Sequence, residues 1–348
     1  MISAAGLDLP KEWIDRQLSE NTPPFFVTEC DSRLFAVSKT VVWYIFPDKD
    51  GNRIGDGGQA VQTFAKEYFT GKIAAHGWAL LNSNHKLAFS HSEIECLKLL
   101  ENESGVIKNL GHYYYRNPSS GILWRGMLTE YYPRKHLDID TFYGNGLELS
   151  KKLIETVARI HSKGVMHRDI KPRNILLDDS GDPIVADFGY ACVEESILVD
   201  SFAGTPAFYS PEHVKFYLSE QYRAGKKDDV WAIAVTVYKI IFRRYPYYLY
   251  FQGIDVGPKE LAKNRNIPLT LIERMRVFDK TIEPKSDILC KLKKMFAYLA
   301  SDRPSLLELL PIDSQKEEVK PLDKPKQIVI IQEGLAFHPN GRIRPVFF

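Results

Sequence analysis

The chain has 348 residues, 46 Lys and Arg against 44 Asp and Glu, a formal net charge of +2, and 44% hydrophobic residues. This composition fits one large two-lobed domain or two ordinary domains, and it excludes a disordered, fibrous or disulfide-stapled protein. So small a net charge gives no general attraction to nucleic acid or to an anionic membrane, and we expect neither as a partner.

Several features of the chain bear on its compartment. The four cysteines include no CxxC pair, which argues against zinc and against a disulfide framework and favours a reducing compartment. The first residues show neither the basic nor the apolar region of a signal peptide, and the apolar run 230–238 is too short to cross a bilayer. We therefore expect a cytoplasmic protein, and delivery into another cell by a route without a cleavable signal stays open.

In chain order, the first predicted element is a short helix within an extension of residues 1–24. Aromatic and β-branched residues broken by turn residues predict an antiparallel sheet from residue 25 to about 81. A helical period then follows over 90–101, and a second strand pair brackets the turn NPSSG. One helix among strands indicates an α+β layout.

The second half of the chain changes to a helical pattern. A long helix with an apolar stripe is predicted over about 147–163, ended by Gly164. Mostly helical sequence continues to residue 312, and a tail covers 313–348, in which a charged segment precedes the apolar stretch IVIIQEGLAF. The pattern therefore predicts a mixed region over 25–132, a mainly helical region over 133–312, and an extension at each end.

Two polar motifs stand close together in the helical half. Residues 167–174 read HRDIKPRN, and Asp187 opens the triplet DFG thirteen residues later. Phosphoryl transfer needs a carboxylate that orients the attacking hydroxyl and accepts its proton, which suits Asp169. Asn174 and Asp187 can converge as hard oxygen ligands of Mg²⁺, and Lys171 can neutralise the transferred phosphate.

These two motifs resemble the catalytic loop and the metal-binding loop of the eukaryotic-type protein kinases. The resemblance implies a bilobal α+β fold, in which an antiparallel sheet and one helix form the N-lobe and helices form most of the C-lobe. It also implies a nucleotide cleft between lobes within residues 25–312, catalytic roles for Asp169, Lys171 and Asn174, and metal binding by Asn174 and Asp187.

The resemblance continues through the rest of the C-lobe. The segment AGTPAFYSPE resembles the end of the activation loop, where Thr205 would contact the catalytic loop and Glu212 would pair with Arg303. Asp229 matches the acid that braces the backbone of the catalytic loop. The apolar run after Asp229 predicts a helix that is buried on all sides.

Two features point to a branch of the family and to its regulation. Lys171 in HRDIKPRN, together with GTPAFYSPE, resembles the serine/threonine kinases rather than the tyrosine kinases. Arg168 is the residue that docks an activation-loop phosphate in relatives, and Ser201 lies at the spacing of that phosphosite. One hypothesis is that phosphorylation of Ser201 orders the loop, which the activity of a Ser201→Ala variant tests; the alternative is an ordinary loop serine.

The N-lobe resembles the family less closely. The stretch GDGGQA resembles the phosphate-covering glycine loop with Gly55 and Gly57 retained, and an ungapped alignment places Ala75 at the adenine-covering alanine. The segment TEYY resembles the hinge, so the backbone of Glu130 and Tyr132 would bond adenine. These residues, with Glu93 and Asp187, form the predicted nucleotide site.

The same alignment places Gly77 where the family has the lysine that contacts the α- and β-phosphates. Glu93, the expected partner of that lysine, then has no cation at this position. Either another residue supplies the charge, as in the with-no-lysine kinases, or this lobe is misaligned. The nearby candidates are three lysines and a histidine, although strand alternation turns two of these away from the Gly77 side: Lys66, Lys72, Lys86 and His76.

Two functions remain open from the sequence. The first is a protein serine/threonine kinase that uses ATP with Mg²⁺, or with Mn²⁺ as an alternative, on protein substrates and that has a regulatory protein as a further partner. The second is a pseudokinase that binds a partner protein as a scaffold or allosteric module. The motifs at Asp169, Asn174 and Asp187 favour chemistry, whereas Gly77 favours the binding role.

Overall fold

The structure is a computed structural model. It describes the following residues: 26–30, 33–38, 40–47, 53–56, 60–116, 121–133, 136–194, 196, 198, 203–218, 222–246, 250–251, 254–255, 266–279, 282–283 and 285–311. The predicted extension 1–24 and the predicted tail 313–348 lie outside these residues, so both stay predictions.

The described chain divides into two compact units. The first contains the described residues of 26–90 and 108–131, and the second contains those of 91–107 and 132–311. One division falls between Tyr131 and Tyr132, and another falls inside a helix.

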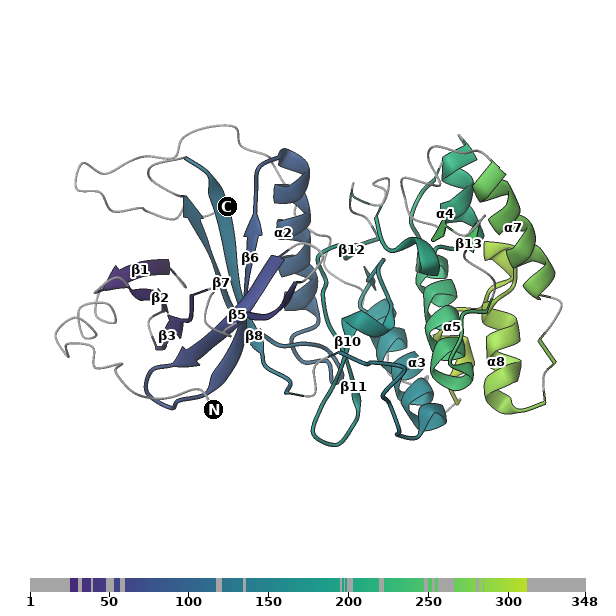
Figure 1. The fold of residues 1–348 in the computed structure, drawn as a ribbon, viewed down its shortest axis with the longest axis horizontal. Coiled ribbons are helices and arrows are strands. Elements are labelled where there is room, and N and C mark those ends of the chain that lie inside the picture. The colour runs from purple at the N-terminus through teal and green to yellow at the C-terminus, as the bar shows by residue number, and fades with distance from the viewer. Residues whose placement is uncertain are drawn as a thin grey trace. The chain divides into compact units, whose positions relative to one another are not determined.

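The first unit is built on one antiparallel sheet (Figure 1). The strands lie in the order β1-β2-β3-β5-β6-β8-β7, with β4 paired to β5. Strand β1 also comes into contact with β7, so the sheet curls toward closure. The strands have these bounds: β1 Phe26–Cys30, β2 Arg33–Val37, β3 Val42–Ile45, β4 Arg53–Asp56, β5 Ala60–Glu67, β6 Ile73–Leu80, β7 Asn109–Arg116 and β8 Leu123–Glu130.

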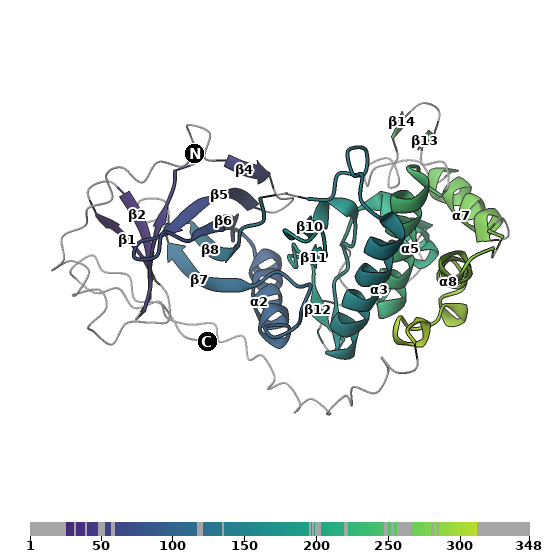
Figure 2. The same cartoon turned by 90° about the horizontal axis from the view of Figure 1, so that it is seen from below.

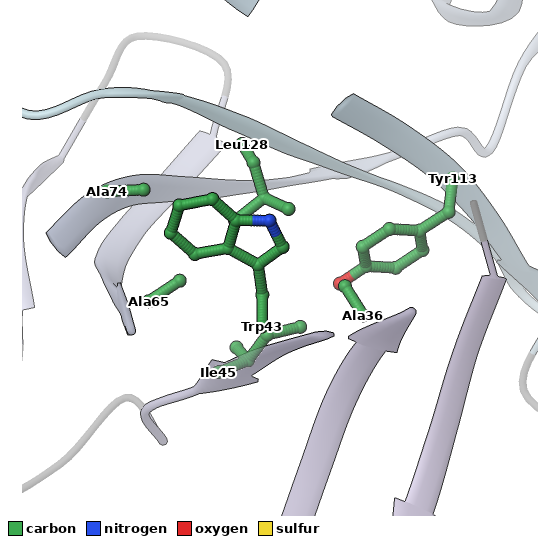
Figure 3. Packing of buried hydrophobic residues seen from close by; sticks show 7 residues of the cluster. All are labelled: Ala36, Trp43, Ile45, Ala65, Ala74, Tyr113 and Leu128. Carbon is green, nitrogen blue, oxygen red and sulfur yellow. The ribbon is translucent and has the colours of Figure 1, made fainter. Parts of the chain in front are cut away.

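The inner face of this sheet carries a hydrophobic core to which β2 and β3 also contribute. Trp43 of β3 lies among small and branched side chains of the neighbouring strands, near the ring of Tyr113 (Figure 3). Trp43 is 4% exposed and Tyr113 is 2% exposed, and burying a large side chain of this kind contributes about 1.5–3 kcal/mol. The cluster consists of seven buried residues: Ala36, Trp43, Ile45, Ala65, Ala74, Tyr113 and Leu128.

A buried histidine lies in the same interior. His76 of β6 has no exposed surface, and its Nε2 lies 2.8 Å from the Tyr113 hydroxyl. Burial lowers the pKa of His76 to about 3, so the ring is neutral. Gly126 makes room for the partner, because a Cβ at this position would lie 2.2 Å from the Tyr113 ring. The pair is therefore a packed, uncharged part of the core.

One helix, α2 (Asn84–Leu99), follows β6. It begins six residues before the predicted start at residue 90, because the Ser83 hydroxyl accepts the Lys86 amide at 3.2 Å and caps a polar first turn. The apolar period marks only the buried part of this region, where Ile94 and Leu97 of the helix and Leu100 directly after it are at most 6% exposed.

The second unit is mainly helical, as predicted. Asn145 caps α3 with its side-chain oxygen on the amides of the first turn, and α3 packs beside α5, as both views show (Figures 1 and 2). Helix α5 is buried on nearly all sides, with Trp231 inaccessible to solvent. The longer elements have these bounds: α3 Gly146–Ser162, α4 Pro211–Lys215, α5 Lys226–Phe242, α7 Asn266–Asp279 and α8 Asp287–Met295.

Short antiparallel strand pairs complete this unit. Strand β9 (Val165–Met166) pairs with β12 (Cys192–Val193), and β10 (Ile175–Leu177) pairs with β11 (Pro183–Val185). A further pair joins β13 (Tyr250–Phe251) to β14 (Ile254–Asp255). The first two pairs enclose the residues of both polar motifs. No helix among the described residues is long and apolar enough to span a bilayer.

We expect His76 to make the protein acid-labile. In the unfolded chain His76 titrates near 6.5, whereas in the folded state its pKa is about 3, so the unfolded state binds more protons between these values. The free energy of unfolding then falls as the pH drops through this window, by about 2 kcal/mol between pH 6.5 and 5.0.

Urea unfolding at both pH values measures this loss. His76→Gln should lose about 2 kcal/mol less than the wild type on acidification, because glutamine does not titrate. His136→Gln, at an exposed position, is the matched control and should behave as the wild type. Equal losses in the wild type and in His76→Gln would contradict the assignment.

Candidate active site

The loop that carries HRDIKPRN is held by a carboxylate of α5. Asp229 Oδ2 accepts the amide of His167 at 2.7 Å, and Oδ1 accepts the amide of Arg168 at 2.8 Å. His161 of α3 places its Nε2 3.0 Å from Oδ2. One buried side chain thus connects α3, the loop and α5.

The state of Asp229 follows from these contacts. Burial by itself would raise the pKa of Asp229, but the hydrogen bond and charge of His161 and the contacts of His167 outweigh it and leave the pKa below its ordinary value. The carboxylate is therefore charged at neutral pH. It holds Arg168 in a left-handed conformation, at a φ of 67°, which an unsupported arginine seldom adopts.

Asp169, the next residue, is the centre of a dense polar cluster. Lys171 Nζ lies 2.6 Å from Asp169 Oδ2, and the Thr205 hydroxyl donates to Oδ1 at 2.7 Å. Lys171 Nζ also donates to Thr205 Oγ1 at 2.8 Å. Asn174 Nδ2 donates to the Asp169 backbone oxygen at 2.8 Å and to Oδ2 at 3.1 Å. The structure therefore brings all three predicted catalytic residues together, with Thr205.

Asp187 reaches the same region across the β10–β11 hairpin. The Ala186 amide donates to the Asn174 carbonyl at 2.8 Å, and His167 Nε2 lies 3.0 Å from the Ala186 carbonyl. Phe188 is 1% exposed and packs 4.7 Å from the His167 ring, centroid to centroid. Asp187 itself has a φ of 60°, so the backbone turns sharply where its carboxylate is presented.

The electrostatics around Asp187 favour a cation. Burial first, and then the charge of Asp169, raise the pKa of Asp187. A divalent cation would offset both effects, and Asn174 and Asp187 supply the one amide and one carboxylate that suit Mg²⁺ when phosphates and water complete its shell. Within the described part of the chain, no three His, Cys, Asp or Glu side chains form a metal-binding group.

A second anchor fixes the segment that carries Thr205. Arg303 Nη2 contacts both carboxylate oxygens of Glu212, at 3.0 and 2.8 Å, and the Arg303 side chain is fully buried. Its Nε donates to the Ala297 carbonyl at 2.8 Å, and the guanidinium lies 5.0 Å from the Trp231 ring centre. The predicted ion pair is present, and it joins the segment to the end of the unit.

Arg168 does not extend into solvent. Its side chain is buried, and Nη1 donates to the Leu198 carbonyl at 2.9 Å and lies 3.6 Å from Cys192 Sγ. Ser201, the candidate phosphosite, lies outside the described residues, so its role stays a prediction.

The predicted nucleotide residues of the first unit are placed on its sheet. Gly55 lies in β4 opposite Gln62, and Ala75 lies in β6 opposite Thr129 of β8. Glu130 ends β8, and its amide donates to the Lys108 carbonyl at 3.1 Å. Gly57 lies outside the described residues. Tyr132 and Glu93 fall in the second unit, where Glu93 is 5% exposed in α2.

Gly77 lies in the middle of β6, as aligned. It pairs with Gln62 on one side and with Met127 on the other, and no bulge interrupts these two ladders. The strand therefore carries no side chain at the residue that the sequence alignment places opposite the family lysine. The described strands show no one-residue slip that would turn His76 to the Gly77 side, and the alignment of Gly77 with the family lysine stays a prediction.

Two polar residues near these positions had not been singled out from the sequence. His161, which braces Asp229, is a lone histidine in the apolar stripe of α3. Arg125 is an arginine inside the apolar strand β8 and is only 5% exposed. In each case, the sequence places a polar residue at a position where the apolar pattern predicts a buried side chain, and this mismatch could have identified the residue.

Comparison with protein-family models identifies the family. Residues 49–313 match the model described as the protein kinase domain. The chain belongs to the protein kinase family. The bilobal α+β kinase fold predicted from the sequence is thereby confirmed.

Curated relatives of this kinase come from plants, fungi and a nematode. Mitogen-activated protein kinase kinase kinase 17 of Arabidopsis thaliana is 25% identical over 265 residues, 69% of this chain and 66% of the relative. Serine/threonine-protein kinase chk1 of Schizosaccharomyces pombe is 31% identical over 198 residues, 54% and 36% of the two chains. CBL-interacting protein kinase 29 of Oryza sativa is 44% identical over 88 residues, 25% and 19%. The kinase thus spans two thirds or less of each relative's length.

We expect the Glu212–Arg303 pair to carry much of the stability of the second unit. Glu212→Gln removes the carboxylate and leaves the buried guanidinium of Arg303 uncompensated, which should lower the free energy of unfolding by about 3 kcal/mol. Glu283→Gln is the matched control, because Glu283 pairs with Lys285 on the surface and should cost at most about 0.5 kcal/mol. Equal midpoints of urea unfolding for the two variants would refute this role.

Proposed function

We propose that this kinase transfers the γ-phosphoryl group of ATP to serine and threonine hydroxyls of protein substrates with the help of Mg²⁺. The observation that carries the proposal is the Asp169 carboxylate, which Lys171, Thr205 and Asn174 contact together at 2.6–3.1 Å. A side chain fixed in this way costs no reorganisation when a substrate arrives, which is the main source of catalysis in phosphoryl transfer.

Each residue of the cluster has a chemical task in this proposal. Asp169 orients the substrate hydroxyl and accepts its proton while the hydroxyl oxygen bonds the γ-phosphorus and the bond to the β-phosphate oxygen breaks, so that ADP leaves. Lys171 neutralises negative charge on the transferred group, and the Thr205 hydroxyl holds the Asp169 and Lys171 side chains in place through a hydrogen bond to each. The side-chain nitrogen of Asn174 donates to Asp169, which leaves the side-chain oxygen of Asn174 for a metal.

Asn174 and Asp187 would hold the metal, which supplies charge neutralisation on the triphosphate when it is bound. The raised pKa of Asp187 supports this assignment, since a nearby cation lowers the cost of keeping that carboxylate charged. Gly55, Gly57, Ala75, Glu93, Glu130 and Tyr132 remain the proposed nucleotide contacts. Mn²⁺, which also prefers oxygen ligands, is the proposed alternative metal.

Serine and threonine are the proposed acceptors for two reasons. Lys171 bonds both Asp169 and Thr205, and this lysine within HRDIKPRN resembles the serine/threonine branch. Among the relatives, the name of the fission yeast protein is serine/threonine-protein kinase chk1.

The CBL-interacting kinases are named for a binding partner, which supports the proposal that a regulatory protein also binds this chain.

Gly77 favours a second candidate, a pseudokinase that binds a partner protein and transfers nothing. A strand glycine cannot contact phosphates as a lysine does, and the loss of such a charge weakens transition-state stabilisation. The complete cluster around Asp169 argues for transfer, and the experiment below separates the two functions.

Radiolabelled ATP with Mg²⁺ or Mn²⁺ tests the proposal through autophosphorylation. We expect transfer by the wild type, a loss of about 10²–10⁴-fold in Asp169→Ala because the proton acceptor is removed, and a comparable loss in Asp187→Ala because the metal is released. Asp179→Asn, an exposed carboxylate on the β10–β11 turn, is the matched control and should transfer at the wild-type rate.

Two results would count against the proposal. Transfer that persists in both alanine variants would show that Asp169 and Asp187 do not have these roles. A wild type that transfers no phosphate with either metal, but still binds a partner protein, would instead establish the pseudokinase.

A further inference from the structure

The register of the first sheet shows which side chains share the surroundings of Gly77. Residues opposite each other in an antiparallel pair point to the same face, and successive residues along a strand point to opposite faces. Ala75, Gly77 and Ala79 of β6 therefore share one side of the sheet, here called the Gly77 face. The nearest neighbours in the same row are Gln62 and Met127, which are both uncharged.

The opposite face excludes His76 as the replacement for the missing lysine. His76 lies in the interior that also holds Ala74 and Tyr113, and it is bonded to the Tyr113 hydroxyl at 2.8 Å. Its pKa of about 3 keeps it uncharged at neutral pH. A neutral, buried ring on the wrong side of the strand cannot take the place of an ammonium group.

The lysines considered from the sequence are also unsuitable. Lys72 lies just before β6, five residues from Gly77, so strand alternation directs it to the opposite face. Its side chain is 54% exposed, and its Nζ lies 3.9 Å from Glu130 Oε1. Lys66 is on the Gly77 face, but it lies four residues along β5 from the partner of Gly77, about 13 Å away, and its Cε lies beside the turn glycine Gly71. Lys86 lies in the exposed first turn of α2.

Arg125 meets the requirements that these residues fail. It lies in β8 directly opposite Ala79, so it projects from the Gly77 face, and it stands diagonal to Gly77 itself. Diagonal neighbours are about 7–8 Å apart, within reach of a long side chain. Its side chain is 5% exposed, and the residues beside it on β6, Gly77 and Ala79, are small and leave room for a guanidinium. A buried arginine whose neighbours in β8 are Trp124 and Gly126 requires a reason.

We propose that Arg125 supplies the positive charge that Gly77 lacks, so that the phosphate-positioning cation of this kinase projects from β8 instead of β6. The inference rests on the proposed function, because it assigns Arg125 to the phosphates of the same nucleotide. A guanidinium suits this task, since its planar donors can bond two oxygens at once and its charge is permanent. Gly77 then leaves space for the Arg125 side chain, and its lack of a side chain does not mean that the nucleotide site is lost.

Nucleotide binding tests this inference without reliance on turnover. We expect Arg125→Met to weaken the binding of a fluorescent ATP analogue in the presence of Mg²⁺ by about 10- to 100-fold, because a charge-assisted contact is removed. Gly77→Lys in the Arg125→Met background should restore binding to within about fivefold of the wild type, because it returns a cation to the same face. Arg125→Lys should be intermediate.

Lys66→Met and Lys72→Met are the matched controls and should change binding less than twofold. Thermal unfolding without nucleotide separates loss of fold from loss of binding. If Arg125→Met does not fold, Arg125→Gln takes its place, and the lysine rescue at Gly77 is measured in that background.

Wild-type affinity in Arg125→Met, a failure of Gly77→Lys to restore binding, or a large loss in Lys66→Met would each overturn the assignment of Arg125. These outcomes are distinct from failure of the proposed function. A chain that binds the analogue through Arg125 but transfers no phosphate would refute the transferase and leave the role of Arg125 intact. A wild type that binds no nucleotide would refute both.

Discussion

The Asp229 carboxylate accepts two consecutive backbone amides, those of His167 and Arg168, and this contact determines the geometry of the second unit. Arg168 turns through a left-handed φ of 67°, a conformation that costs free energy unless its surroundings enforce it. Asp229 is fully buried, so no water competes for its oxygens, and the ring of His161 helps to keep it charged. The direction in which Asp169 leaves the loop follows from this turn.

Other contacts extend the same constraint outward. Asp228, next to Asp229 on α5, accepts the hydroxyl of Ser210, and the Glu212–Arg303 pair fixes the chain two residues later. Thr205, in the same segment, is thereby held against Asp169 and Lys171. The cluster around Asp169 therefore depends on two side-chain pairs that anchor the segment just after Thr205.

In the first unit, the sheet separates a buried apolar interior from the face that carries Gly77. This curled sheet buries an apolar interior to which β2 and β3 add Ala36, Trp43 and Ile45, and the face that carries Gly77 stays separate from that interior. Because strand alternation assigns each side chain to one face, a residue of this sheet can replace a charge missing at Gly77 only if its strand and parity put it on the same face. Arg125 satisfies this condition.

Local motifs could be interpreted from the sequence, and long-range register could not. The loop around Asp169 and the DFG turn at Asp187 occupy short, continuous stretches, so their residue types and spacing sufficed. Parity along β6 likewise predicted that His76 turns away from Gly77. The pairing of Ala79 with Arg125 joins strands far apart in the chain, and the polar first turn of α2 carries no apolar period. Such features cannot be predicted from the sequence, because they depend on which strands pair in the fold and on a helix turn without apolar residues.

The central claim is that the Asp229 contact positions Asp169 for phosphoryl transfer, and the activity of Asp229→Asn tests it most directly. An asparagine of nearly equal size has one acceptor oxygen for two backbone amides, so the loop loses a buried hydrogen bond. We predict a fall in kcat of about 100-fold with KM for ATP nearly unchanged, because the catalytic carboxylate shifts while the nucleotide contacts remain. A folded Asp229→Asn variant with wild-type kcat would contradict the account.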